Sequence, residues 1–365
     1  MSKNPFNPTF GDVPKIYLDT NERAAKLVTT IKESDFARSF FITGVRGSGK
    51  TSFMTQVENE LSKDKNCHCI DLVNDESLLS SFIDQLGKAS KTKIQHIIEE
   101  LGIKSINFKD LSFNFNQKIQ DGNKTAEVAK KMMKNIQKNN QYVLVVIDEV
   151  DNSQPIRSFA QIFNELKRHG FPIYVLMTGL PDLIMDVQNE KKLTFLLRSE
   201  KEVMTPLQNS NMTLAYQKVF NCDIALAQKM TQMVKGYSYG FQLLGYLAFE
   251  EMAETKSEFS TEKLSKVIDI YKMNLFDNAY NKIFSDLSEM DQKYLIAVLG
   301  NKRLKEVVQQ LHVTPSYASQ YRRRAIARHL IQPGSYGHVK YILPFFKEFI
   351  QSTQDPDSIY FYDIE

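Results

Sequence analysis

Residues 40–55, which read FFITGVRGSGKTSFMT, constrain the fold of this chain more than any other stretch. A short apolar run leads into Gly44-Val45-Arg46-Gly47-Ser48-Gly49-Lys50-Thr51, which matches the G-x-x-x-x-G-K-[ST] phosphate loop. The three glycines let the backbone turn tightly and direct its N–H groups inward, where a side chain would block a phosphate. The helix expected after the loop adds its positive dipole end. The stretch therefore predicts a strand, a loop and a helix that together bind a nucleoside triphosphate.

The same motif assigns individual roles. Lys50 is predicted to reach the β- and γ-phosphates of the nucleoside triphosphate, which also places it among the catalytic residues, and the Thr51 hydroxyl is predicted to bind Mg²⁺. The residues expected to surround the nucleotide run through the whole loop and into the helix: Gly44, Val45, Arg46, Gly47, Ser48, Gly49, Lys50, Thr51 and Ser52.

A second motif lies at residues 141–149, QYVLVVIDE. Its unbroken β-branched run is typical of a strand buried on both faces of a parallel sheet, and ligand sites of such sheets lie at the carboxyl ends of their strands. Asp148 is predicted to hold Mg²⁺, and Glu149 is predicted to act as the general base that polarises the attacking water. The alternative is a strand that ends in two solvated acids, and the strand context together with the upstream phosphate loop favours the catalytic reading.

Four or five apolar strands alternate with helices in the first 205 residues, which predicts an α/β fold with a mostly parallel sheet. Strands are expected near 40–43, 67–73, 142–147 and 173–177, with a last short strand at Val203-Met204 and a small hairpin at 104–115.

The remainder of the chain is predicted to be largely helical. Residues 303–311, a turn at 312–315 and residues 316–330 form a helix-turn-helix candidate, and residues 330–343 form a hairpin wing around a Pro/Gly-rich turn. We expect a nucleotide-binding core at 1–205, a helical lid with a connecting helix at 206–280, a winged helix at 281–352 and a frayed tail at 353–365.

Taken together, these motifs resemble the AAA+ ATPases, and within them the Orc1/Cdc6-like and archaeal-type ATP-binding proteins. The segments that carry the resemblance are NPTFG, TGVRGSGKT, VLVVIDEVD, the strand ending in Thr178-Gly179, GYSYGFQLLG and the C-terminal winged helix. The resemblance implies a sheet ordered 5-1-4-3-2 and a helical lid over the nucleotide. It also implies that Thr178 is the first sensor and that Arg198 reaches the γ-phosphate of a neighbouring subunit in a homo-oligomer, with an ordinary surface arginine as the alternative.

Two departures from the family pattern affect these expectations. The lid segment GYSYGFQLLG lacks the arginine that many AAA+ proteins use as a second sensor to couple the lid to the nucleotide. The Gly-Arg pair common near the N-terminal helix is replaced by Thr20-Asn21-Glu22-Arg23, so only Arg23 corresponds.

The predicted second helix of the helix-turn-helix is basic. Between residues 302 and 340 the chain has eight Lys and Arg residues but a single acid, whereas its overall formal charge is only +3. The side chains expected to face outward toward double-stranded DNA are Ser316, Ser319, Gln320, Arg323, Arg324 and Arg328. A winged helix that contacts protein is the alternative.

The sequence thus predicts a slow, Mg²⁺-dependent AAA+ ATPase that couples ATP binding and hydrolysis to DNA binding through its winged helix. A signalling switch whose winged helix binds a protein partner, and a transposition-type regulator that coats DNA as a filament, are the two alternatives. Three cysteines and an N-terminus without an apolar leader are expected of a cytoplasmic protein, and no apolar run approaches the roughly 20 residues that span a bilayer.

Overall fold

The computed structural model describes residues 3–9, 11, 13–18, 22–92, 122–191 and 193–362. The chain forms two compact units. The sheet unit comprises Asn21–Thr43 and Lys50–Val203, and the lid unit comprises Met1–Thr20, Gly44–Gly49 and Met204–Glu365. The expected four-part division stays a prediction, and the hairpin expected at 104–115 lies outside the described residues.

The sheet unit is built on five parallel strands in the order β2-β3-β4-β1-β5, which confirms the order that the family resemblance implies. The strands are β1 (Arg38–Thr43), β2 (Cys67–Leu72), β3 (Tyr142–Ile147), β4 (Ile173–Gly179) and β5 (Glu200–Val203). All five carboxyl ends meet at one edge, because the strands run in the same direction.

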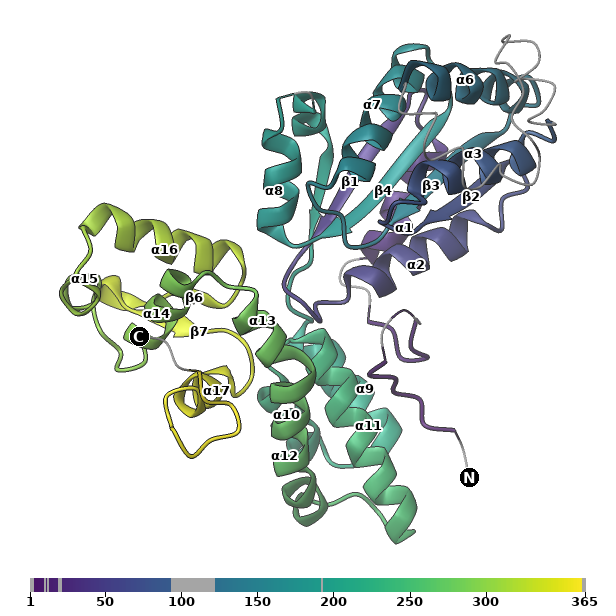
Figure 1. Ribbon diagram of the computed structural model, residues 1–365. Coiled ribbons are helices and arrows are strands. Elements are labelled where there is room, and N and C mark those ends of the chain that lie inside the picture. Colours follow the sequence, from purple (N-terminus) through teal and green to yellow (C-terminus); the bar gives the residue numbers. More distant parts are fainter. Residues whose placement is uncertain are drawn as a thin grey trace. The chain divides into compact units, whose positions relative to one another are not determined.

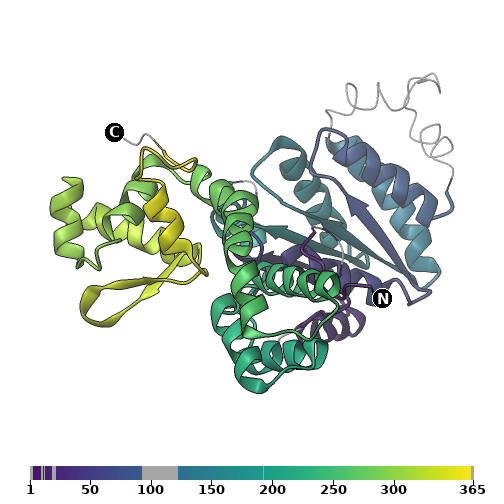
Figure 2. The same cartoon turned by 90° about the horizontal axis from the view of Figure 1, so that it is seen from below.

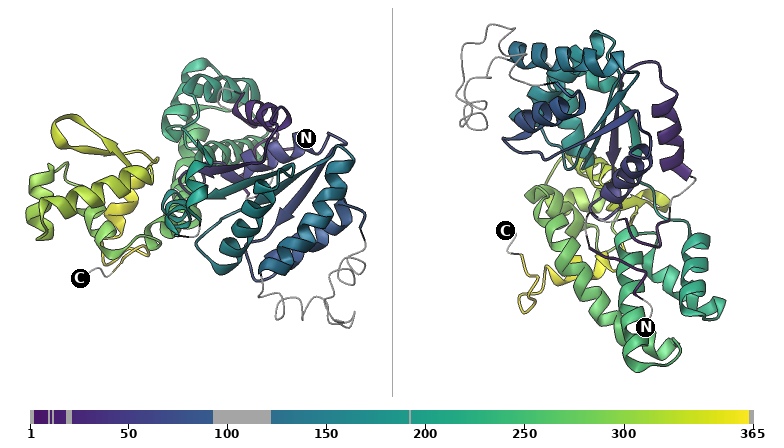
Figure 3. Two further views of the ribbon diagram at one scale, coloured as in Figure 1. Left: turned by 90° about the horizontal axis from the view of Figure 1, so that it is seen from above. Right: turned by 90° about the vertical axis from the view of Figure 1, so that its right-hand side faces the viewer.

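Helices cover both faces of this sheet (Figures 1, 2 and 3). One face carries α1 (Arg23–Lys32) and α2 (Lys50–Leu61), and the other carries α3 (Leu78–Ala89), α6 (Gly122–Lys138) and α7 (Gln154–Arg168). Val143, Val145 and Ile147 of β3 pack into the core under α3, α6 and α7, while the intervening β3 residues are equally buried. Burial on both faces explains why the sequence of β3 is an uninterrupted apolar run.

The fifth strand differs from the expectation. The sequence predicts it at Val203-Met204, but β5 is Glu200–Val203 and pairs with β1 at the edge of the sheet. Its residues, EKEV, contain no apolar run because an edge strand is partly solvated. Side chains fix it instead: Arg38 Nη1 lies 2.7 Å from Glu200 Oε1, and Arg23 forms an ion pair with Glu202. Between β4 and β5 the chain forms α8 (Pro181–Asn189) and the short 3₁₀ helix η3 (Thr194–Arg198).

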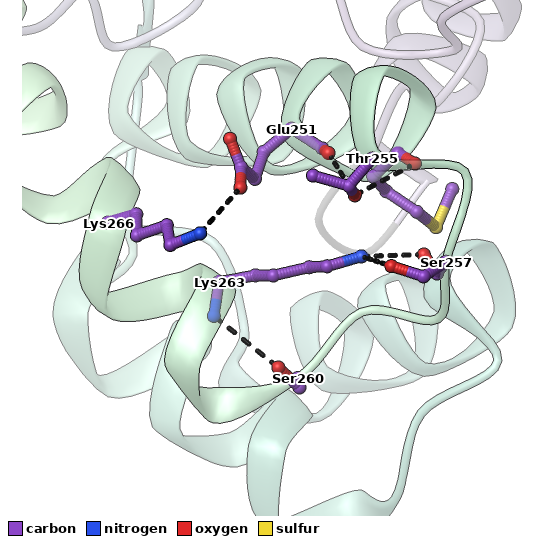
Figure 4. A network of polar contacts seen from close by, with 7 residues as sticks. Glu251, Thr255, Ser257, Ser260, Lys263 and Lys266 are labelled. Atoms are coloured by element: carbon purple, nitrogen blue, oxygen red, sulfur yellow. Dashed lines mark hydrogen bonds and ion pairs between the residues drawn. The ribbon is translucent and has the colours of Figure 1, made fainter.

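The lid unit begins with a bundle of helices. It contains α9 (Asn209–Phe220), α10 (Ile224–Val234), α11 (Ser238–Thr255) and α12 (Thr261–Leu275), followed by the π turn η4 (Phe276–Tyr280) and α13 (Asn281–Ser285). The α11–α12 connection is closed by a polar network around the buried Lys263, whose Nζ donates to the Ser257 carbonyl at 2.7 Å (Figure 4). Helix α11 starts at Ser238, so the first turn of this helix lies within the lid segment GYSYGFQLLG.

The N-terminal segment packs into this bundle, although its sequence position suggested the nucleotide-binding core. The Phe6 ring is buried against the rings of Phe220 and Phe241, with centroid distances of 5.9 and 5.6 Å. The contact is close because Gly245 of α11 has no side chain: a Cβ there would lie 2.4 Å from the Phe6 ring.

The C-terminal residues form a winged helix, as predicted. Its elements are α14 (Glu289–Ala297), α15 (Leu304–Leu311), α16 (Pro315–Ala327), the antiparallel strands β6 (Ile331–Pro333) and β7 (Val339–Tyr341) joined through η5 (Ser335–Gly337), and α17 (Phe346–Ser352). The predicted second helix ends earlier than residue 330, since His329 adopts a left-handed backbone conformation with φ 55°.

The chain beyond α17 is described as far as residue 362, and two of its tyrosines contact other parts of the lid unit, while the expectation of a frayed tail stays a prediction. Tyr360 Oη donates to Asp277 Oδ1 at 2.7 Å, and the Tyr362 ring lies 5.0 Å from the Phe284 ring. Within the described parts of the chain, no helix is long and apolar enough to cross a membrane.

Candidate nucleotide site and basic helix

Three predicted site residues meet at the carboxyl edge of the sheet. Thr51, at the start of α2, donates from Oγ1 to Asp148 Oδ2 at 2.8 Å, and Thr178, at the end of β4, donates from Oγ1 to Asp148 Oδ1. Thr178 is fully buried. The sequence separates these residues by up to 127 positions, and the parallel register of β3 and β4 brings them together. The arrangement puts a carboxylate and a hydroxyl next to each other, as a Mg²⁺–nucleotide site requires.

Glu149 follows directly and is exposed, with its backbone in the left-handed region at φ 51°. Its amide donates to Asp148 Oδ1 at 3.0 Å and to Thr178 Oγ1 at 3.1 Å, and its carbonyl accepts from Asn74 Nδ2 at 3.0 Å. The backbone of Glu149 is therefore held from both neighbouring strands, because Asn74 follows β2 and Thr178 ends β4.

The sequence analysis did not identify Asn74 as a residue of this site. Its amide also donates to Asp151 Oδ1 at 3.1 Å, and its Oδ1 accepts from Ser153 Oγ at 3.1 Å, so it fixes the turn after β3. The sequence could have indicated Asn74, because a polar residue two positions beyond the carboxyl end of β2 lies at the same edge of the sheet as Asp148.

This edge of the sheet suits a divalent cation. Partial burial, and then the charge of Asp148, raise the pKa of Asp71 on β2. Among the described residues no cluster of three or more His, Cys, Asp or Glu side chains forms a complete metal site. In phosphate-loop proteins Mg²⁺ takes one hydroxyl and one carboxylate from the protein, and Thr51 and Asp148 offer such a pair.

The phosphate loop itself belongs to the lid unit. Gly47 and Gly49 have φ values of 76° and 89°, which residues with a Cβ rarely adopt. The Ser48 amide donates to the Val45 carbonyl at 3.1 Å, closing a tight turn, and the buried Ser48 hydroxyl has no hydrogen-bond partner in the described part of the chain. Both features fit a loop whose polar groups receive a phosphate.

The two arginines singled out by the resemblance lie in different settings. Arg198 ends η3 and is exposed. Partial burial, together with the nearby guanidinium groups of Arg198 and Arg38, lowers the pKa of Lys167. Arg23 contacts the edge strand, since its Nη2 donates to the Val203 carbonyl at 2.8 Å in addition to the ion pair with Glu202.

Helix α16 carries the predicted DNA-contacting side chains, and one of them is placed differently from the expectation. Arg324 does not simply face outward: its Nε and Nη2 donate to Oδ1 of the buried Asp291 at 2.9 and 2.7 Å. Asp291 lies on α14, so this ion pair joins two helices of the winged helix. That Arg324 contacts DNA stays a prediction, but its guanidinium already pairs with a carboxylate inside the domain.

The other five predicted residues remain candidates. Ser316, Gln320 and Arg323 are exposed, whereas Ser319 and Arg328 are half-buried. Ala318 and Ala325 are buried, as expected for the inner face of the helix. The exposed aromatic rings of Tyr317 on α16 and Tyr336 at the tip of the wing were not anticipated.

With this geometry described, comparison with known proteins identifies the fold. Residues 20–178 match the KAP family P-loop domain. The structure of the Aeropyrum pernix ORC2 protein in ADPNP–ADP complexes resembles the chain with a TM-score of 0.59 and 11% identity, over 90% of this chain and 92% of that one. The chain has the Orc1/Cdc6-like P-loop NTPase fold. The sequence resemblance is thereby confirmed at the level of fold.

A further match supports the Orc1/Cdc6-like fold over the whole chain. Cdc6p from Pyrobaculum aerophilum is similar with a TM-score of 0.51 and 10% identity, over 97% of this chain and 99% of that one. Residues 277–350, which include the winged helix, match a family described as a domain of unknown function (DUF8462). Comparison with the curated proteins finds no sequence match.

Proposed function

We propose that this chain is a slow, Mg²⁺-dependent ATPase whose nucleotide state controls the binding of duplex DNA by its winged helix. The observation that carries the proposal is the Thr51–Asp148–Thr178 cluster at the carboxyl edge of a phosphate-loop sheet. The ORC2 structure of similar fold is described as ADPNP–ADP complexes, which supports adenine nucleotides as the ligand class.

The roles follow from position. Lys50 opens α2 next to Thr51 and would neutralise the terminal phosphates, and Thr51 and Asp148 would hold Mg²⁺. Bound Mg²⁺ supplies positive charge that stabilises the phosphate oxygens during transfer. Glu149, exposed beside Asp148, would accept the proton of the attacking water, and the Thr178 hydroxyl would report the nucleotide state to Asp148. Arg198 would act toward a neighbouring subunit in a homo-oligomer.

The hydrolysis part is tested with Glu149→Gln. We expect turnover to fall by about 10²- to 10⁴-fold, the usual contribution of a general base, while the affinity for a fluorescent ATP analogue stays within twofold. Glu33→Gln, at an exposed site beyond α1, is the matched control and should leave both values unchanged. Unchanged turnover in Glu149→Gln would remove Glu149 from the mechanism.

The DNA part rests on the charge of the winged helix. The single acid between residues 302 and 340, Glu306, accepts the Arg303 amide at 2.7 Å as a helix cap, so it does not oppose the basic helix face. Exposed Arg323 on α16 and exposed Lys340 on β7 extend this charge from the helix to the wing. Such a distribution suits the phosphates of a duplex.

The competing reading is a winged helix that binds protein, and the exposed rings of Tyr317 and Tyr336, at 56% and 88% exposure, favour it. Fluorescence anisotropy with duplex DNA across a salt series separates the two. DNA binding predicts an affinity that falls with a slope of about −0.9 per phosphate contacted, and a difference between ATP and ADP if the units are coupled. Absence of binding at low salt in every nucleotide state would leave the protein-binding alternative.

A further inference from the structure

The outer side of the phosphate loop is held by the first turn of α11. Three consecutive loop carbonyls accept hydrogen bonds from three consecutive lid residues. Tyr237 Oη donates to the Arg46 carbonyl at 2.8 Å, the Tyr239 amide donates to the Gly47 carbonyl at 2.9 Å, and Ser238 Oγ donates to the Ser48 carbonyl at 3.1 Å. All six residues belong to the lid unit.

These bonds determine where the loop amides point. A peptide group is planar and trans, so a carbonyl fixed toward α11 directs the following N–H to the opposite side. The bonds from Tyr237 and Ser238 therefore orient the amides of Gly47 and Gly49 away from the lid. Inward-pointing amides of this kind are what a phosphate loop uses to bind its ligand.

Tyr237 is built tightly into this position. A Cβ at Gly47 would lie 2.3 Å from Tyr237 Oη and 2.9 Å from Tyr239 Cβ, so the loop approaches the tyrosines as closely as glycine allows. The Tyr237 ring is buried and packs on the ring of Tyr280 at 6.4 Å. Tyr280 is anchored in turn, since its Oη donates to the Pro344 carbonyl at 2.6 Å. Burial raises the pKa of Tyr237 far above its usual value, which keeps the hydroxyl a neutral donor.

We propose that Tyr237 is a positioning residue for nucleotide binding, which holds the phosphate loop in its binding conformation from the lid side. The inference rests on the proposed function, because it takes the loop to be the nucleotide site. Although the lid segment lacks a second-sensor arginine, it holds the loop backbone through Tyr237, Ser238 and Tyr239.

The experiment compares Tyr237→Phe with Tyr216→Phe. Tyr216 is a matched control because its buried hydroxyl also donates to a backbone carbonyl of the lid, that of Phe241 at 2.9 Å. Each variant loses one hydroxyl hydrogen bond, and we expect similar decreases in thermal unfolding temperature. Only Tyr237→Phe should weaken the binding of a fluorescent ADP, by about five- to tenfold, the value of one hydrogen bond.

A second readout does not depend on nucleotide. Hydrogen exchange of the amides at residues 46–49 in the nucleotide-free protein should be faster in Tyr237→Phe and unchanged in Tyr216→Phe. If Tyr237→Phe does not fold, Ser238→Ala, which removes the bond to the Ser48 carbonyl at a half-buried site, should accelerate the same amides and weaken ADP binding by about two- to threefold.

The outcomes distinguish this inference from the proposed function. Equal ADP affinity and equal loop exchange in Tyr237→Phe and Tyr216→Phe would overturn the positioning role while leaving nucleotide binding intact. Failure of the unmodified protein to bind any nucleotide would overturn the proposed function, and faster loop exchange in Tyr237→Phe would still establish that the lid holds the loop.

Discussion

Replacing Arg324 by methionine removes the partner of a buried carboxylate and is expected to destabilise the winged helix. The Asp291 side chain is only 6% exposed, and its Oδ1 accepts both bonds from Arg324 while its Oδ2 accepts from Ser288 Oγ at 2.7 Å. Without Arg324 the carboxylate keeps one side-chain hydrogen bond. Removing one partner of a fully buried pair costs about 3–5 kcal/mol.

Exposure of Arg324 to solvent reduces this cost. The Arg324 side chain is 38% exposed, so water reaches the space that the guanidinium leaves. We therefore expect Arg324→Met to lower the free energy of unfolding of the winged helix by about 2 kcal/mol. The Asp291→Asn/Arg324→Met double variant should be more stable than Arg324→Met alone, because no unpaired charge remains buried.

The assay is native-state hydrogen exchange of the amides in α14 and α16, which reports the opening free energy of this part of a multidomain chain. Arg323→Met is the matched control: Arg323 is exposed on the same helix, and its replacement should change the opening free energy by less than about 0.5 kcal/mol. On duplex DNA the ranking should reverse, with Arg323→Met weakening binding in proportion to one lost phosphate contact. Equal stability of Arg324→Met and Arg323→Met would refute the structural role and return Arg324 to the set of DNA contacts.

Three further predictions concern the rest of the lid unit. Burial lowers the pKa of His329, so the folded state binds fewer protons than the unfolded chain, and the stability contributed by neutral His329 is lost as the pH falls below about 6.5. Asn tolerates the left-handed backbone of this position, so His329→Asn removes the titrating group without straining the chain. The variant should lose less thermal stability than the unmodified protein between pH 7.5 and 5.5, and an equal loss would contradict the assignment. Gly245→Ala should drive Phe6 from its pocket at a cost of about 1–2 kcal/mol, seen as faster proteolysis before residue 10, and an unchanged digestion pattern would argue against the docking. Tyr360→Ala combined with Tyr362→Ala should destabilise the C-terminal part by about 2 kcal/mol in urea unfolding, whereas a frayed tail would show no change.

The sequence by itself determined the features that depend on residues close together in the chain. The phosphate loop and the buried strand ending in Asp148-Glu149 are contiguous motifs, and their residue types follow from backbone conformation and from burial on two faces. The helices and wing of the C-terminal domain were readable for the same reason, because hydrophobic periodicity and turn residues are local signals. The meeting of Thr178 with Asp148 followed from the parallel order of strands that the family resemblance implied.

Tertiary structure alone decided the features that depend on a partner far along the chain. Edge strand β5 has no apolar pattern and forms because its backbone pairs with that of β1 in parallel register. Arg324 resembles its neighbour Arg323 in sequence, and only the buried Asp291, 33 residues away, separates their roles. Tyr237 belongs to a segment that lacks the expected arginine, and its hydroxyl gains a role because folding brings it to the Arg46 carbonyl, 191 residues away. A local sequence pattern indicates whether a side chain faces the core or the solvent, whereas the packing of distant segments determines which residue it contacts.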